Sequence, residues 1–273
     1  MSLQPDHADD VCALPLVRRM AALLDRDPAG FANGDQLPRG WHVALFNPPT
    51  RQSDLRADGA ANLGVIFPDL GLPRLMMAGR KMEFIGDIPI GARVLRASRL
   101  GEVTHKVGKS GRFALVNVEH RITVADSDTP VVIETNSYVL REAAGGAPID
   151  PAVTAAMQIP PVDVSRTVVP DETMLFRYSA ITDNPHRIHY DLAYAQSEGY
   201  PALVVNGTVP AMLLLELFRT HVGGEPVRWS SRNLAPILCG ETLTLTLTSE
   251  DNGWMMRANG PSGKTTLEAK VWQ

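Results

Sequence analysis

The sequence lacks the features that mark several large protein classes. Its 273 residues include two cysteines, Cys12 and Cys239, which stand far apart without a CxxC or other metal-binding spacing. This usage is typical of a reducing compartment and argues against a disulfide framework. The longest apolar runs, such as Val209 to Leu215, are too short to cross a bilayer, and the first residues lack the pattern of a signal peptide. We therefore expect a cytoplasmic protein with no membrane partner.

There is also no excess of positive charge. Lys and Arg total 26 against 30 Asp and Glu, so the formal net charge is −4. Proteins that bind nucleic acids usually carry a basic surface, so we expect no nucleic-acid partner. An anionic ligand would need a local patch of cations. Hydrophobic residues make up 44% of the chain, as is ordinary for a globular protein, and the length suits one large domain or two of about 130 residues.

What is present in the first half is a helical pattern followed by a β pattern. Residues 13–25 carry apolar side chains at helical spacing. Between residues 82 and 141, many apolar residues alternate with polar ones, as a half-buried antiparallel sheet requires. The strand-length runs are 94–100, 113–122 and 131–140. The tetrad Gly108-Lys109-Ser110-Gly111 predicts a turn between two of these strands.

A second unit follows a proline-rich stretch. Residues 145–161 contain four prolines and predict a domain boundary, so we expect domains at 1–145 and 164–273 with a linker at 146–163. The expected elements of the second unit are a strand at Met174–Tyr178, helices at Leu192–Ser197 and Pro210–Thr220, and strands at Thr242–Thr248 and Thr265–Trp272.

The two units echo each other. Ile88–Val94 places an apolar segment and a glycine before a strand, and Pro236–Leu243 does the same in the second unit. Both are followed by a turn and further strands. The echo suggests a duplicated α+β unit in which an antiparallel sheet wraps a helix, although the match is loose and leaves the duplication open.

The densest polar cluster lies between Thr182 and Asp191. It contains His186, His189 and two carboxylates within a few residues of an expected strand and an expected helix. A loop with rigid flanks can aim acids and bases, and histidine can both accept and release a proton near neutral pH. The cluster is therefore a candidate catalytic loop.

Two plainer interpretations of this cluster remain. Asn184-Pro185 can begin a polar turn, and Asp191 can cap the helix that follows. His186 and His189, three residues apart, could also contribute to a transition-metal site, but no HExxH pattern or distant ligand cluster supports one, so we expect no metal.

At this loop the chain resembles a known family. Residues 178–195, with the sequence YSAITDNPHRIHYDLAYA, and residues 198–207, EGYPALVVNG, are similar to a segment of the MaoC-like double hot-dog hydratases and dehydratases. The nearest branch holds the itaconyl-CoA and mesaconyl-C4-CoA hydratases and the mitochondrial type of 3-hydroxyacyl-thioester dehydratase. The likeness extends to residues 37–42, 51–55, 77–80 and 108–113.

The resemblance implies a fold, a substrate class and a reaction. The fold would be an α+β double hot-dog, with two antiparallel sheets that each wrap a central helix and with the catalytic loop in the C-terminal domain. The reaction would be addition of water to an acyl-CoA α,β double bond, or its elimination, by acid–base catalysis. The acyl group would be small and dicarboxylic, as in itaconyl-CoA or mesaconyl-CoA. A homodimer is one expectation for its assembly.

This chain departs from the broader hydratase motif. In that motif an aspartate stands five residues before the catalytic histidine and an asparagine three before it. Counting back from His189, this chain has Asn184 and His186 at those places. Asp183 stands where an apolar residue is more usual, and Asn206 replaces a common histidine. The identity of the carboxylate partner is therefore open.

Hydration of an unsaturated thioester needs a base for water, an acid for the α-carbon and a donor for the enolate oxygen. The resemblance points to His189 for proton transfer, with Asp183 as its acidic partner. Asn184 would orient the water, and His186 would hold Asn184 or the substrate. The backbone N–H of Gly207, before the helix expected at 210–220, is the candidate oxyanion donor, with a plain helix-entry turn as the alternative.

Coenzyme A, as part of the substrate, brings phosphates that cations should meet, and we expect no separate cofactor. Arg80, Lys81 and Arg232 are the candidates. Taken singly, an exposed cation is more often solvated surface, as it would also be for Lys106, Lys109, Arg112 and Arg228.

Two rival functions stay open. Hot-dog domains also serve as acyl-CoA thioesterases, in which such a loop would direct water at the thioester carbonyl. A non-catalytic acyl-thioester binding module is the other rival, because Asp183 and Asn206 depart from the family pattern.

Overall fold

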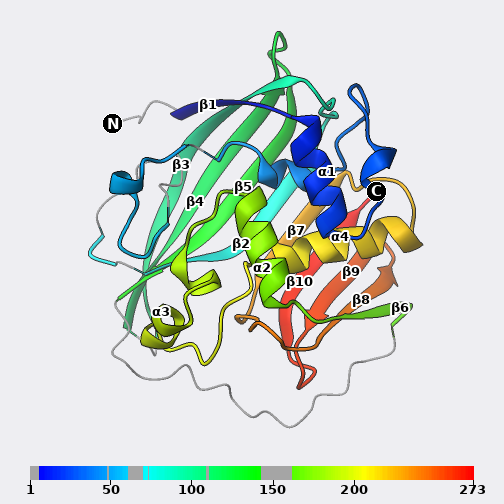
Figure 1. Cartoon of the computed structure of the whole chain (residues 1–273). Coiled ribbons are helices and arrows are strands. Elements are labelled where there is room, and N and C mark those ends of the chain that lie inside the picture. The colour runs from blue at the N-terminus through cyan, green and yellow to red at the C-terminus, as the bar shows by residue number, and fades with distance from the viewer. Residues whose placement is uncertain (1–5, 48, 61–69, 73, 109–110, 143–161) are drawn as a thin grey trace.

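Ten strands form one continuous antiparallel sheet (Figure 1). The computed structural model describes residues 6–47, 49–60, 70–72, 74–108, 111–142 and 162–273. The strands are β1 (Asp6–Val11), β2 (Arg74–Phe84), β3 (Arg93–Gly108), β4 (Gly111–Val124), β5 (Pro130–Arg141), β6 (Val164–Val168), β7 (Arg228–Asn233), β8 (Leu243–Glu250), β9 (Gly253–Asn259) and β10 (Thr265–Trp272).

The strand order shows that the unit is duplicated. The sheet runs β1-β3-β4-β5-β2-β7-β10-β9-β8-β6, so each half, read from its own edge, has the same order of equivalent strands. The echoing segments Ile88–Val94 and Pro236–Leu243 lead into β3 and β8, which hold equivalent positions. The halves meet where β2 pairs with β7, with Arg80 opposite Ser231.

The helices lie across one face of this sheet, which we call the inner face (Figure 1). The longest, α4, contacts β8, β9 and β10, and nine of its thirteen residues are buried. The α-helices are α1 (Leu14–Leu23), α2 (Glu172–Ile181), α3 (Leu192–Ser197) and α4 (Val209–His221), and the 3₁₀ turns are η1 (Pro28–Gly30), η2 (Trp41–Ala44), η3 (Gln52–Asp54) and η4 (Arg187–His189).

The N-terminal half differs from the C-terminal half in its central helix. Among its described residues no helix takes the place that α4 holds over the other half, although a long helix was expected in each. The short turn η2 and the residues after it lie there instead, with Trp41, Leu45 and Phe46 buried. Part of the inner face of β2 to β5 is therefore covered by irregular chain.

Of the elements expected at stated residues, most are confirmed and one is wrong, while the turn expected at 108–111 includes residues 109–110, which lie outside the described residues. Residues 174–178, expected as a strand, lie within α2. Asp171 caps that helix by accepting from the N–H of Met174 at 2.8 Å, and Leu175, Tyr178 and Ile181 bury one helical face at a spacing of three. The expected linker falls almost wholly on residues 143–161, outside the described residues, so the domain limits stay predictions.

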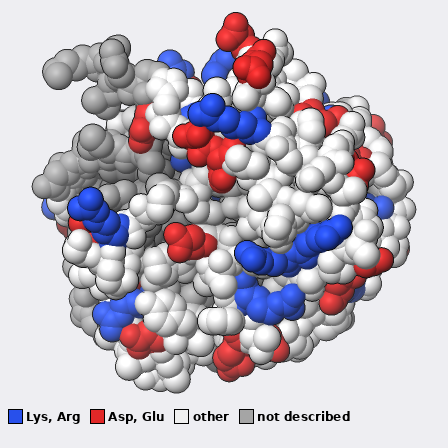
Figure 2. All heavy atoms as spheres, turned by 45° about the horizontal axis from the view of Figure 1, so that its top comes forward, with Lys and Arg blue, Asp and Glu red and all other residues white. Residues whose placement is uncertain are grey.

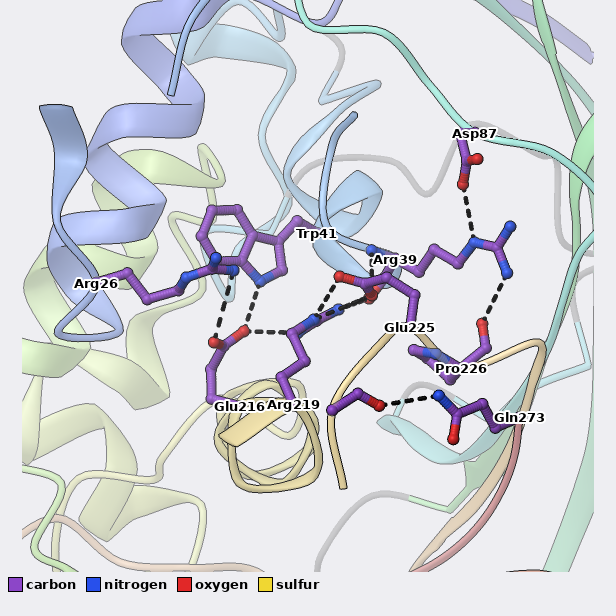
Figure 3. A network of polar contacts seen from close by, with 10 residues as sticks. Arg26, Arg39, Trp41, Asp87, Glu216, Arg219, Glu225, Pro226 and Gln273 are labelled. Atoms are coloured by element: carbon purple, nitrogen blue, oxygen red, sulfur yellow. Dashed lines mark hydrogen bonds and ion pairs between the residues drawn. The ribbon is translucent and has the colours of Figure 1, made fainter. Parts of the chain in front are cut away.

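A network of polar contacts fastens the N-terminal half to α4 (Figure 3). The buried Glu216 accepts a hydrogen bond from Trp41 Nε1 at 3.0 Å and from Arg219 Nη1 at 2.6 Å. Arg219 also pairs with Glu225 at 2.8 Å and donates to the carbonyl of Arg39. Because Glu216 and Arg219 each have charged partners, the contact of the two halves includes a buried ionic network as well as apolar packing.

Candidate active site

The candidate catalytic loop connects α2 to α3 and lies on the inner side of the sheet (Figure 1). Its two ends are held by helix caps. Asp191 accepts from the N–H of Tyr194 at 3.0 Å and so caps α3, which confirms the plainer interpretation of that residue. Its other oxygen holds Arg187 at 2.8 Å.

Asp183 closes the other end, and its side chain is exposed. Its φ of 44° lies in the left-handed region, and the next N–H, that of Asn184, donates to the carbonyl of Ser179 at 2.9 Å. This is the hydrogen bond of a Schellman helix end, where the left-handed residue is usually glycine or asparagine. Among the described contacts, none joins the Asp183 carboxylate to His186 or His189.

His189 is buried and held in one tautomer. Nδ1 of His189 lies 2.7 Å from the carbonyl oxygen of Val204. A carbonyl can only accept, so Nδ1 carries the proton and Nε2 keeps its lone pair in the neutral ring. Burial lowers the pKa of His189 to about 4, against the opposing effect of the Val204 hydrogen bond. At neutral pH the ring is uncharged and offers Nε2 as a base.

His186 faces His189 and lies near a carboxylate from the N-terminal half. The two rings meet edge to face with centroids 5.5 Å apart, and His186 Nε2 is 4.0 Å from Asp58 Oδ2. The backbone of Asp58 accepts from the N–H of Arg187 at 2.8 Å. Asn184 Oδ1 accepts from the N–H of His186 at 3.2 Å, which fixes the turn between them. The acid that the structure places beside His186 is thus Asp58 rather than Asp183.

Gly207 stands two residues before α4 and is exposed. No described residue accepts a hydrogen bond from its N–H, whereas the next N–H, that of Thr208, donates to Asn206 Oδ1 at 3.0 Å. The turn begins two residues after Val204, the residue that holds His189. A free N–H at a helix entrance can stabilise a developing negative charge.

The three cations expected at the coenzyme do not lie together. Arg80 points to the inner face, where it pairs with Glu134 at 3.3 Å, and its side chain is 12% exposed. Lys81, the next residue of β2, and Arg232 of β7 are exposed and leave the strands on the outer face. The structure therefore does not bring Lys81 or Arg232 to the catalytic loop, and Arg80 is engaged inside the protein.

Other charged residues do reach the loop region. Arg74 of β2 lies 3.5 Å from Glu198, at the end of α3. Arg56 pairs with Asp58 at 3.0 Å, close to His186. No local pattern could have found them, because they stand more than a hundred positions before the loop that they approach.

Comparison with known proteins supports the resemblance at the catalytic loop. The family model for hydroxyacyl-thioester dehydratase type 2 (Htd2) matches residues 40–239. The chain is also 39% identical over 269 residues to the mesaconyl-C(4)-CoA hydratase of Chloroflexus aurantiacus, which covers 96% of this chain and 92% of that protein. The chain belongs to the Htd2 family. It is an enzyme of the hydratase or dehydratase class that acts on acyl thioesters.

Solved structures confirm the expected double hot-dog fold of this Htd2 family member. A MaoC-like dehydratase from Phytophthora capsici matches with a TM-score of 0.74 at 15% identity, over 100% of this chain and 96% of that one. HtdX of Mycobacterium tuberculosis matches with a TM-score of 0.69 at 18% identity, over 97% and 99%. At these identities the likeness concerns the fold alone.

Charge, metal ligands and membrane spans of this Htd2 protein can be examined over its described residues. Figure 2 shows Lys and Arg interspersed with Asp and Glu over the face in view, with a few cations gathered at its right side. Within the described residues no three His, Cys, Asp or Glu side chains are grouped so as to hold a metal ion. No described helix is long and apolar enough to cross a membrane.

Proposed function

We propose that this protein hydrates the α,β double bond of an acyl-CoA thioester, with His189 as the base. The observation that carries the proposal is the buried, neutral ring of His189, whose Nδ1–H is held by the carbonyl of Val204. That contact leaves Nε2 as the acceptor for a proton of water. A base that is already held in the reactive tautomer and orientation does not have to reorganise before it accepts the proton, which lowers the activation free energy.

The step would proceed as follows. Nε2 of His189 takes a proton from water while the water oxygen bonds to the β-carbon. The electron pair of the double bond then moves toward the thioester, and the N–H of Gly207 stabilises the enolate oxygen. The protonated His189 then gives that proton to the α-carbon, which completes the addition and returns the ring to its neutral form. Asn184 and His186 would position the water, and Asp58 would orient His186.

The acyl group that we propose is small and dicarboxylic. Support comes from the 39% identical relative, which is named for mesaconyl-C4-CoA, and itaconyl-CoA is the second candidate. For the phosphates of coenzyme A we keep Lys81 and Arg232 as proposed contacts, on the outer face. Arg80 pairs with Glu134 inside the protein, so it would contribute to the coenzyme site only indirectly, by fixing the conformation of β2.

A substrate panel tests this function. Purified protein is mixed separately with mesaconyl-C4-CoA, itaconyl-CoA and crotonyl-CoA, and both enoyl-thioester absorbance and free thiol are followed. We expect absorbance to fall without release of thiol, and fastest with a dicarboxylic substrate. Release of thiol would indicate a thioesterase, and binding without either change would indicate a non-catalytic module.

Two properties of the whole protein belong to the same proposal. We propose a cytoplasmic enzyme that forms a homodimer, because cysteine usage suits a reducing compartment and hot-dog proteins commonly associate. Light scattering on the purified protein measures the assembly directly. A mass equal to one 29.7 kDa chain would exclude the dimer.

A further inference from the structure

A polar band crosses the inner face of the N-terminal half. Register places Ser98 of β3, His120 of β4 and Glu134 of β5 side by side, because opposed residues of antiparallel strands point to the same face. Arg80 and Asn136 form the next row and are hydrogen-bonded at 2.9 Å. The band separates the main core from a smaller apolar cluster formed by Leu72, Ala114, Val116, Val118, Tyr138 and Leu140.

The described polar side chains of the band and its border each have a hydrogen-bond or ion-pair partner, except that of Arg96. Glu134 binds His42 Nε2 at 2.7 Å and Arg80 at 3.3 Å, and these neighbours lower the pKa of its carboxyl against the effect of burial. Ser98 Oγ lies 2.9 Å from His120 Nδ1. Burial lowers the pKa of His120 to about 4, so the ring is neutral at pH 7. Such pairing is what a buried polar group requires.

Arg96 is the exception. It extends from β3, two residues before Ser98, and its guanidinium stacks on the ring of Phe46 at 5.0 Å from the centroid. Its Nε is buried and has no hydrogen-bond partner, and no described carboxylate lies within 4.0 Å of it. Burial is the largest cause of its lowered pKa, with Glu134 the first of the groups that oppose the shift.

The charges on this face do not balance. Within the described residues of the band and its border, the guanidinium groups of Arg80 and Arg96 stand against the single carboxylate of Glu134. The acids of β1, Asp6 and Asp10, act on Arg96 only from outside ion-pair distance. Arg96 is half-buried, and a guanidinium whose buried Nε lacks a hydrogen-bond partner is costly. An anion supplied from outside would remove that cost.

The Arg80 end of the band lies near Gly207. A Cβ added to Gly207 would lie 3.3 Å from Asn233 Nδ2, which donates to the carbonyl of Met77, and the sulfur of Met77 lies 3.9 Å from Arg80 Nη2. Arg80 also acts on Tyr178 of α2. Burial raises the pKa of the Tyr178 phenol, and the charge of Arg80 and a hydrogen bond with Thr208 oppose that rise. Thr208 follows Gly207, the candidate oxyanion donor. The inner face here carries η2 and Phe46 rather than a long helix.

We propose that Arg96 binds the free carboxylate of a dicarboxylic acyl group and so selects the substrate. A guanidinium matches a carboxylate with two parallel hydrogen bonds, and stacking on Phe46 holds its plane. Arg80 and Glu134 would support this subsite as an internal pair. The inference rests on the proposed acyl-thioester function and adds the residue that distinguishes dicarboxylic from monocarboxylic substrates.

The kinetic test compares two substrates in two variants. Arg96→Met keeps the apolar stem and removes the charge, and Arg99→Met changes an exposed arginine of the same strand. In Arg96→Met we expect kcat/KM for mesaconyl-C4-CoA to fall about 10- to 100-fold, the range for a lost hydrogen bond to a charged group. For crotonyl-CoA, which has no free carboxylate, kcat/KM should stay within about threefold. Arg99→Met should change neither.

A binding test separates this inference from the proposed reaction. Calorimetry with succinyl-CoA and butyryl-CoA, which have no double bond to hydrate, reports carboxylate recognition even if no hydration is seen. Arg96→Met should abolish the preference for succinyl-CoA, and Arg96→Lys, which keeps the charge without the planar fork, should retain part of it. Equal losses for both ligands, or an unchanged preference, would show that Arg96 does not read the carboxylate.

Discussion

At the scale of single residues, environment separates the two histidines of the catalytic loop. His189 is buried, with its Nδ1–H committed to Val204, whereas His186 is partly exposed and faces Asp58. Burial lowers the pKa of both rings, and for His186 the carboxylate of Asp58 opposes that shift. Their different partners suit proton transfer at His189 and positioning at His186.

Loss of His189 should remove most of the activity. His189→Ala deletes the proposed base, so we expect kcat to fall about 10²- to 10⁴-fold, the usual contribution of general acid–base catalysis. The residue lies in a polar loop, but it is also buried and bonded to Val204, so a modest decrease in melting temperature is expected. A variant with more than half of the wild-type rate would exclude His189 from the mechanism.

The pH profile of the wild type gives a second measure of the same residue. A buried histidine with a lowered pKa stays neutral as the pH falls below 6.5 and becomes protonated only near its folded value of about 4. The base is active above that value and lost below it. The acid limb of kcat/KM should therefore lie below pH 6.5, and a limb above that pH would contradict the assignment.

The two aspartates near the loop should behave differently. Asp183 has an exposed side chain at a left-handed position, so Asp183→Asn should keep the rate and leave the melting temperature equal or slightly higher. Asp58→Asn removes the carboxylate beside His186 and should lower kcat. Steady-state kinetics of the two variants decide which acid matters. A large loss in Asp183→Asn with none in Asp58→Asn would restore Asp183 as the acidic partner.

At the scale of elements, α4 organises the contact of the two halves. Glu216 and Arg219 on this helix hold Trp41 and Arg39 from the N-terminal half (Figure 3). The backbone comes close enough to α4 only because residue 40 is glycine. Its φ is 98°, and an added Cβ would lie 2.5 Å from Leu215 Cδ1.

Gly40→Ala should therefore destabilise the protein through both its φ and its packing. We expect a loss of about 2–4 kcal/mol in the free energy of unfolding, measured by urea denaturation, from left-handed strain plus overpacking against α4. Gly34→Ala is the matched control, because its φ is 93° but nothing lies within 4 Å of the added Cβ. Equal losses in the two variants would mean that contact with Leu215 contributes nothing.

At the scale of the whole molecule, two copies of one strand order meet in a single chain. β2 and β7 pair at the centre, and Gly79 allows the approach, since a Cβ there would lie 2.3 Å from the carbonyl oxygen of Ser231. His186 of the candidate catalytic loop lies 4.0 Å from Asp58 of the first copy, and Glu198, just after α3, pairs with Arg74 of the first copy. The site therefore draws on both copies.

Separation of the copies should abolish activity. Residues 164–273 expressed alone would expose the edge of β7 and the face of α4 that binds Trp41, so we expect an inactive fragment that aggregates or self-associates. Co-expression of residues 1–145 should restore part of the activity, as measured by hydration assays and light scattering. A stable, monomeric and fully active C-terminal fragment would exclude a site that needs both copies.

The elements that could be predicted are those whose pattern of apolar and polar residues lies within a single stretch of chain. The strands at 94–100, 113–122 and 131–140 lie within β3, β4 and β5, because alternation within one strand already reports a half-buried sheet. The window 174–178 was too short to separate strand from helix, and the Asp171 cap that decides for α2 lies outside it. Residues 58 and 186 meet across more than a hundred positions, which no local pattern encodes.

The sequence by itself determined the family and indicated the candidate catalytic loop, because the residues that carry both signals are contiguous, from Tyr178 to Gly207. Only the tertiary structure decided which charges lie near the candidate loop. Arg80 and Lys81 are neighbours in the chain but point to opposite faces of β2, and Asp183 turns outward where Asp58 turns in. Side-chain direction follows from strand register and from helix ends set by distant packing, so it is a property of the assembled sheet.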